Sequence, residues 1–299
     1  NRGSIVEAGG IAPLLSIIEQ NTKAKEASLK AISKLAYKSE SIQSAITAAG
    51  GIPLLVNSLA SSSNAKEMMA QAGLYSLAAN ALSQLAKGSR ENQSKISEAG
   101  AIPSLVSILG TPVPDLQANA AECLGNLAGN NPDIQAAIAR TGAIAPLCTL
   151  LRDGQSDEVK EQAAAALWSL SLDNKPNKDT VAKLGGVEPL VNLLVMGTSE
   201  FSLDQATGAL SSMSSKHMEN RETICKLIVA RLGSKAQMLQ TPTGAVRLLK
   251  AVARMCHGSN SNQAAIAKVG GVPTLIMWLS GGFSDGKTGG NLEAQAAAA

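Results

Sequence analysis

Apolar residues recur along the chain at helical spacing, and one short phrase interrupts them at intervals. The phrase is a glycine, a small residue, Ile or Val, a proline within two positions and usually a leucine. It occurs six times, at residues 9–14, 50–54, 100–103, 142–147, 185–190 and 270–273. Successive first glycines are 41, 50, 42, 43 and 85 residues apart. The last interval is about twice the others, which predicts a degenerate seventh copy near Leu227 that lacks its glycine and proline.

Each copy predicts a corner between two helices. A β-branched residue stands four positions before every first glycine: Ile5, Ile46, Ile96, Ile138, Val181 and Ile266. A glycine that ends one helix and a proline near the start of the next are the usual stop and start signals. A polar loop then leads to a longer, Ala-rich helix with leucines on one face. The pattern therefore predicts three helices in each repeat.

The three helices of one repeat cannot bury their apolar faces alone, but they can bury them against a neighbouring copy. We therefore predict an all-α protein, a right-handed α-solenoid of about seven repeats in one domain. The repeats run over residues 1–38, 39–88, 89–130, 131–173, 174–215, 216–257 and 258–299, the last one truncated. The corner glycine, the proline and the third-helix pattern closely resemble the armadillo repeat family along essentially the whole chain. HEAT repeats, which are two-helix units without a regular glycine corner, are the nearest alternative.

The two ends and the second repeat depart from this regularity. Both ends cut a repeat open, so we expect the sequence to belong to a longer protein, because solenoids finish in polar capping repeats. The second repeat is about eight residues longer than the others, with the excess around residues 61–71. This insertion is either a specific contact or a tolerated loop expansion.

The composition indicates a folded chain and argues against membrane insertion and a nucleic acid partner. Of the 299 residues 45% are apolar, and the net charge is +3, which is typical of a folded chain rather than a disordered one. No apolar run approaches the ~18 residues that span a bilayer, so we expect no membrane insertion. Aromatic residues make up only 2% of the chain, which leaves few platforms for stacking bases. We therefore expect no nucleic acid partner.

Candidate chemistry is sparse. Four cysteines lie far apart in the sequence, Cys123, Cys148, Cys225 and Cys256, and we interpret them as reduced, buried residues of a cytoplasmic protein, with nuclear or cytoskeletal locations as alternatives. Residues 281–288 match the phosphate-binding pattern GxxxxGK[ST]. In the repeat register they follow a second helix, not a buried strand, so we expect no cofactor.

No catalytic or metal-binding arrangement is apparent in the sequence. His217 and His257 stand at the ends of third helices without a carboxylate or nucleophile at a useful spacing. We expect them to be solvated, and His257 alternatively borders the groove that is described next.

The resemblance implies that function lies in a concave groove lined by the third helices. In armadillo proteins that bind extended peptides, a third-helix Asn holds the ligand backbone, and a Trp four residues earlier forms side-chain pockets. The Asn position is occupied here by Lys34, Gln84, Asn126, Ser169, Ser212 and Arg254. The Trp position holds Lys30, Asn80, Glu122, Ala165, Gly208 and Lys250. Only Asn126 matches, and no Trp does, which disfavours a nuclear import adaptor.

Charge suggests the character of the ligand. Residues 1–38 hold 6 basic and 3 acidic side chains, 39–215 hold 10 and 16, and 216–299 hold 10 and 4. We therefore predict amides and hydroxyls in the middle of the groove and cations near its ends, the latter at Lys30, Lys34, Arg247, Lys250 and Arg254. Such a groove favours an extended partner segment with acidic stretches. Ordinary solvated helix faces are the alternative.

The sequence thus indicates a non-enzymatic scaffold or adaptor that binds another protein, as a monomer or within a larger assembly. Two alternatives stay open. The first is that the chain is the substrate-recognition region of a larger protein, such as a ubiquitin ligase with armadillo repeats. The second is that it is a cytoskeletal or ciliary component.

Overall fold

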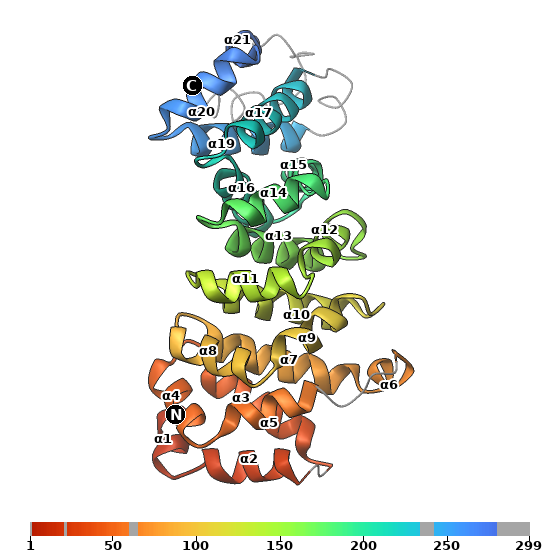
Figure 1. Cartoon of the computed structure of the whole chain (residues 1–299), viewed down its shortest axis with the longest axis vertical. Helices are drawn as coiled ribbons and strands as arrows, with labels where there is room; N and C mark the ends of the chain where they lie inside the picture. Colours follow the sequence, from red (N-terminus) through yellow and green to blue (C-terminus); the bar gives the residue numbers. More distant parts are fainter. Residues whose placement is uncertain (1, 21–22, 60–64, 234–241, 280–299) are drawn as a thin grey trace. The chain divides into compact units, whose positions relative to one another are not determined.

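The computed structural model describes residues 2–20, 23–59, 65–233 and 242–279, and every regular element in these ranges is an α-helix. The chain divides into two compact units, Asn1–Leu170 and Ser171–Ala299. In both units the chain repeats a short first helix, a second helix and, in most copies, a longer third helix (Figure 1). The described residues therefore form an α-solenoid.

The helices fall into three sets by their place in the repeat. First helices are α1 (Arg2–Glu7), α4 (Glu40–Ala48), α8 (Arg90–Glu98), α11 (Pro132–Arg140), α14 (Lys175–Lys183) and α20 (Asn260–Lys268). Second helices are α2 (Ile11–Glu19), α5 (Gly51–Leu59), α9 (Ala101–Leu109), α12 (Ile144–Asp153), α15 (Val187–Met196) and α21 (Gly271–Leu279). Third helices are α3 (Lys25–Ala36), α7 (Ala72–Ala86), α10 (Pro114–Ala128), α13 (Asp157–Ser171), α16 (Glu200–Ser214) and α19 (Pro242–Cys256).

The predicted corner between first and second helices is confirmed at Gly142, whose φ is +85°. The Gly142 N–H bonds to the Ala139 carbonyl at 2.9 Å, and the Ala143 N–H bonds to the Ile138 carbonyl at 3.3 Å. This pair of bonds is the Schellman motif, which satisfies the last carbonyls of α11. A side chain at position 142 would strain the left-handed backbone.

The predicted degenerate copy contains one helix where the other copies have two. The continuous helix α17 (Met218–Gly233) covers 16 residues. Ile224 takes the place of the β-branched residue, and Ile228 stands where the corner glycine would be; both are fully buried. Because isoleucine adopts a left-handed conformation only at a cost, the helix continues through the missing corner.

A second kind of corner joins each third helix to the next repeat. Its first residue is left-handed, and these residues are Lys38, Gly88, Asn130, Asp173, Lys216 and Gly258. The residue that follows caps the next first helix in five copies, by accepting a backbone N–H three positions on: Ser89, Asn131, Asn174, His217 and Ser259.

The carbonyls at the ends of the third helices are bound by one recurring side chain, three residues before the β-branched position. We name these side chains the capping donors: Arg2, Gln43, Gln93, Gln135, Lys178, Arg221 and Gln263. Gln93 donates to the carbonyls of Asn126 at 3.0 Å and Gly129 at 3.1 Å, so it binds the end of the third helix of its own repeat, α10. Helix carboxyl ends lack intrahelical donors, and a donor or cation there is stabilising.

The core lies between the helix layers. It consists of Leu, Ile and Ala side chains, with Leu29, Leu82 and Leu124 fully buried on successive third helices of the first unit. Adjacent third helices approach closely at Gly125, where an added Cβ would lie 3.1 Å from the Ala166 Cα. Small residues thus allow close stacking of the third helices, on which the candidate site depends.

We predict that Gln93→Leu lowers the free energy of unfolding by about 2 kcal/mol or more, because it leaves buried carbonyls and the Asn131 amide without partners. Gln263→Leu changes the same position of another repeat, where the side chain is exposed, and we expect a loss under about 1 kcal/mol. Urea denaturation of both variants measures the difference. Equal losses would contradict a structural role for the buried capping donor.

Candidate partner-binding surface

Third helices lie side by side within each unit. In the first unit α7 contacts both α3 and α10, and in the second unit α16 contacts α19 (Figure 1). We name the exposed and half-buried residues on α3, α7, α10 and α13 up to Leu170 the first third-helix surface, and those on α16 and α19 the second. Contacts between neighbouring third helices hold the residues of each surface in place, and a binding site needs such a support.

Of the five cations predicted for the groove, four are exposed on third helices. Lys30 and Lys34 are exposed on α3, and Lys250 and Arg254 are exposed on α19. The Arg254 guanidinium pairs with the Asp204 carboxylate of α16 at 2.5 Å, and both side chains face solvent. Because exposed ion pairs contribute only about 0–1 kcal/mol, this pair leaves Arg254 open to exchange partners.

The assignment of Arg247 to the basic end of the groove is wrong. Its side chain is only 5% exposed. The guanidinium donates to the carbonyls of Leu194 and Ser199 and to the Ser202 hydroxyl, each at 2.8 Å. Arg247 therefore binds α15 and the start of α16 together. The sequence alone does not show that this arginine lies on the buried face of α19.

The amides predicted to face a ligand are partly used between the helices themselves. The Asn80 amide of α7 donates to the Asn119 side-chain oxygen of α10 at 3.2 Å, and Asn119 donates to the Ser76 hydroxyl at 2.6 Å. Ser33 of α3 donates in turn to the Asn80 side-chain oxygen. This polar ladder joins three consecutive third helices. Sequence reasoning missed Ser33, Ser76 and Asn119, although Asn119 lies two helical turns before Asn126 on the same face.

Asn126 and Glu122 meet at a second polar cluster. The Asn126 amide donates to the Ser83 hydroxyl at 2.7 Å, so the one residue that matches the family pattern already has a partner in α7. Burial raises the pKa of the Glu122 carboxyl, whereas a hydrogen bond with Ser83 and the charge of Lys87 act in the opposite direction. The centre of the first surface thus combines amides with a half-buried acid.

The remaining predicted groove residues are more buried than expected. Gln84 is 7% exposed and Ser212 is 6% exposed, whereas Ser169 is half-buried. The Ser212 hydroxyl has no hydrogen-bond partner among the described residues. The prediction that this row of amides and hydroxyls faces the ligand is therefore wrong for Gln84 and Ser212.

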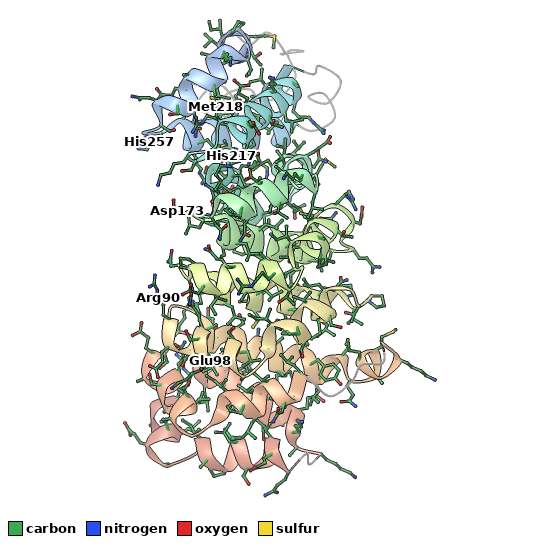
Figure 2. The ribbon with its side chains drawn as sticks, in the orientation of Figure 1. Arg90, Glu98, Asp173, His217, Met218 and His257 are labelled. Atoms are coloured by element: carbon green, nitrogen blue, oxygen red, sulfur yellow. The ribbon has the colours of Figure 1, made fainter. Side chains whose placement is uncertain are left out.

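The expectation that both histidines are solvated fails at His217, which is 6% exposed (Figure 2). Its Nδ1 accepts the Asn220 N–H at 3.3 Å and caps α17, so Nε2 carries the proton and lies 2.5 Å from an Asp179 carboxylate oxygen. This bond, followed by one with Lys175, lowers the pKa of Asp179. His257 is exposed, as predicted.

The cysteines behave as small buried residues. Cys123, Cys148 and Cys225 are buried, and Cys256 is half-buried; all four are free thiols. Burial raises the pKa of Cys148 and of Cys225 to about 11, which disfavours the reactive thiolate. Within the described ranges, no group of three potential ligands is placed to hold a metal ion.

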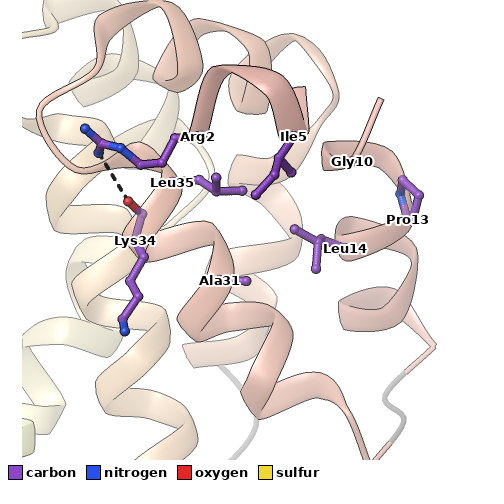
Figure 3. A pocket seen from close by; sticks show the side chains of 8 residues that line it. All are labelled: Arg2, Ile5, Gly10, Pro13, Leu14, Ala31, Lys34 and Leu35. Carbon is purple, nitrogen blue, oxygen red and sulfur yellow. Dashed lines mark hydrogen bonds between the residues drawn. The ribbon is translucent and has the colours of Figure 1, made fainter. Parts of the chain in front are cut away.

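An apolar cavity of about 520 Å³ lies between α1, α2 and α3 (Figure 3). Its lining includes Ile5, Leu14 and Leu35, and Arg2 closes one side by donating to the Lys34 carbonyl at 3.4 Å. Ile5 is 47% exposed, whereas Ile46, at the same place in the next repeat, is fully buried. The cavity therefore lies where the first repeat leaves its packing face open, and it borders the first third-helix surface at Ala31 and Lys34.

Three further sequence features concern the longer loops and the membrane. The described part of the insertion forms α6 (Ala65–Ala70), which contacts α7. The GxxxxGK[ST] match lies outside the described residues, but the segment before it is α21, a helix as predicted. No single described helix is long and apolar enough to cross a membrane, although the bent pairs α4–α5 and α11–α12 together have the required length and composition.

Solved structures share this fold. A crystal structure of an engineered protein has a TM-score of 0.71 and 27% identity, covering 99% of this chain and 68% of that chain. A designed armadillo repeat protein has a TM-score of 0.67 and 22% identity, covering 87% and 99%. Another designed armadillo repeat protein, in complex with the peptide (KR)4, has a TM-score of 0.60 and 20% identity, covering 97% and 96%. The comparison with curated protein sequences finds no match.

The fold is thus that of armadillo repeat proteins, as the glycine corners predict. The family described as plant U-box protein ARM repeat region matches residues 11–286. The chain belongs to this family.

We predict that Asp179→Asn lowers the melting temperature at pH 6, because it removes the charged partner of His217. Since the folded-state pKa of Asp179 is lowered, its contribution is present above the unfolded-state pKa and disappears as pH falls through the folded-state value. The difference in melting temperature between wild type and variant should therefore shrink from pH 6 to pH 3. Thermal unfolding followed by circular dichroism measures it, and a difference that grows at low pH would contradict the assignment.

Proposed function

We propose that the chain is a non-enzymatic scaffold that binds extended segments of another protein on its third-helix surfaces. The observation that carries the proposal is that exposed cations lie on helices which hydrogen bonds hold together. Lys30 and Lys34 are exposed one turn apart on α3, while the polar ladder fixes α3, α7 and α10 to one another. Such a surface supplies many modest contacts without ordering itself on binding.

The charges favour an acidic segment. Lys30 and Lys34 lie on the first surface and Lys250 on the second, all exposed. Complementary charge accelerates association and selects among partners, more than it raises affinity. The designed armadillo protein bound to (KR)4 supports peptide binding by the fold. In this chain only Asn126 matches the Asn positions of peptide-binding armadillo proteins, and no residue matches the Trp positions. This difference from the family pattern supports a different peptide for this chain.

The family match favours a second candidate. It supports the proposal that this chain is the substrate-recognition region of a larger ubiquitin ligase, in which the repeats hold the substrate and a separate domain acts on it. Both candidates use the same surfaces, and for both we propose a cytoplasmic location. They differ in the fate of the bound protein, which ubiquitylation assays with the full-length protein would follow.

We predict that Lys30→Glu/Lys34→Glu weakens binding of a fluorescein-labelled (DE)4 peptide by at least about fivefold, because it reverses both charges on the first surface. Lys250→Glu should act in the same direction on the second surface. Binding should also weaken as salt rises from 50 to 300 mM. Fluorescence anisotropy measures the dissociation constants.

The matched control is Lys183→Glu/Lys226→Glu, which makes the same change of charge on α14 and α17, outside the third helices. Wild-type affinity is expected for the control, and unchanged melting temperatures for all variants. If the control weakens binding as much as Lys30→Glu/Lys34→Glu, the third-helix surfaces are not the binding surfaces.

A further inference from the structure

A polar cavity of about 480 Å³ lies in the second unit, at the junction between the ends of α16 and α19. Ser211 lines it from α16, Ser215 from the residue that follows α16, and Arg254 from α19. Lys216 and Arg221 line it from the beginning of the next repeat. His257 and the start of α20 complete it. Its volume lies within the range of small-ligand sites, about 300–1,000 Å³.

The charge of this cavity is of one sign. Lys216, Arg221 and Arg254 are the charged residues of its lining, and none of the described residues that line it is acidic. At the α7–α10 junction of the first unit, the corresponding places hold the neutral residues Gly88, Gln93 and Asn126. The three cations are therefore a feature of the α16–α19 junction, because the same positions of the α7–α10 junction are neutral.

These cations keep donors for a ligand. Arg221 uses its Nε–H for the Asn262 side chain at 3.2 Å and one other N–H for the Ser214 carbonyl at 3.0 Å, which engages two of its five N–H groups. Lys216 lies 3.5 Å from Asp173, and Arg254 lies 2.5 Å from Asp204. Both pairs are exposed, so a stronger anion exchanges with the carboxylates at little cost.

The hydroxyls of the cavity add neutral donors. Ser211, Ser215 and Ser261 lie among the lining residues, and Ser259 caps α20 through its hydroxyl. The amino end of α20, a helix of nine residues, adds positive potential. Two guanidinium groups, an ammonium group and several hydroxyls suit an ion with several acceptor oxygens and more than one charge.

We propose that this cavity binds the phosphate group of a phosphorylated serine or threonine in the partner segment. A phosphoryl group carries about −1.5 to −2 charges at pH 7 and three acceptor oxygens, which the two arginines and Lys216 match. A carboxylate carries one charge and satisfies fewer of these donors. The inference rests on the proposed function, because Arg254 belongs to the second third-helix surface, along which the segment would lie.

The test is a titration of the ¹⁵N-labelled chain, followed by amide chemical shifts at pH 7 and constant ionic strength. Four probes are compared: N-acetyl-O-phosphoserine N-methylamide, the same compound with serine, the same with glutamate, and inorganic phosphate. We expect saturable shifts near Lys216 and His257 with the phosphoserine compound, and at least fivefold weaker binding of the other three. Equal binding of glutamate or of inorganic phosphate would overturn the proposal.

Variants complete the test. Lys216→Glu/Arg254→Glu should weaken binding of the phosphoserine compound at least tenfold, whereas the control Lys183→Glu/Lys226→Glu should bind as wild type. Arg221 is left unchanged because it also caps α16, and melting temperatures verify that the variants fold. Undiminished binding by Lys216→Glu/Arg254→Glu would overturn the proposed cavity.

The two peptide-binding experiments distinguish a failure of this inference from a failure of the proposed function. If (DE)4 binds and the phosphoserine compound does not, the scaffold function stands and this inference fails. If the phosphoserine compound binds while no extended peptide does, the cavity stands and the proposed function fails.

Discussion

The carbonyls at the carboxyl end of each third helix are the groups on which the architecture depends. They lack intrahelical partners, and they meet the chain where it turns into the next repeat. A left-handed residue makes this turn, and capping donors fill the vacant bonds, Gln43 from the following first helix and Gln93 from the first helix of the same repeat. Gln135 donates both to the Ala128 carbonyl of the preceding repeat and to the Ser169 carbonyl of its own repeat, so this side chain also fixes the stacking of the two repeats.

This constraint explains how the binding surfaces arise. The capping donors lie on the first helices, and the glycine corners end those helices. The third helices therefore carry neither feature, and they have one face toward the core and one toward solvent. The inner face stacks through small residues such as Gly125, and the outer face carries the polar ladder and the exposed lysines. Function can then vary through side chains at the outer positions while the stacking bonds stay constant.

Glycine spacing was sufficient to predict the fold, because each glycine marks a backbone conformation that other residues adopt at a cost. Even the merged helix α17 follows from the missing corner at Ile228. Side-chain partners were harder to predict. Arg247 and Lys250 have the same charge and lie three residues apart, yet Arg247 is buried against α15 and Lys250 is exposed. His217 likewise gained a partner, Asp179, from a different helix, which no sequence spacing indicates.

The central claim is that partner segments lie along the third helices. The most direct measurement places the photo-crosslinking residue p-benzoylphenylalanine at Ala165, the Trp position of α13, and separately at Glu98, which is exposed on the first helix α8. Both variants keep the proposed cations. The account predicts that the fluorescein-labelled (DE)4 peptide crosslinks from position 165 and not from position 98. Crosslinking from position 98 alone, or equally from both, would contradict it.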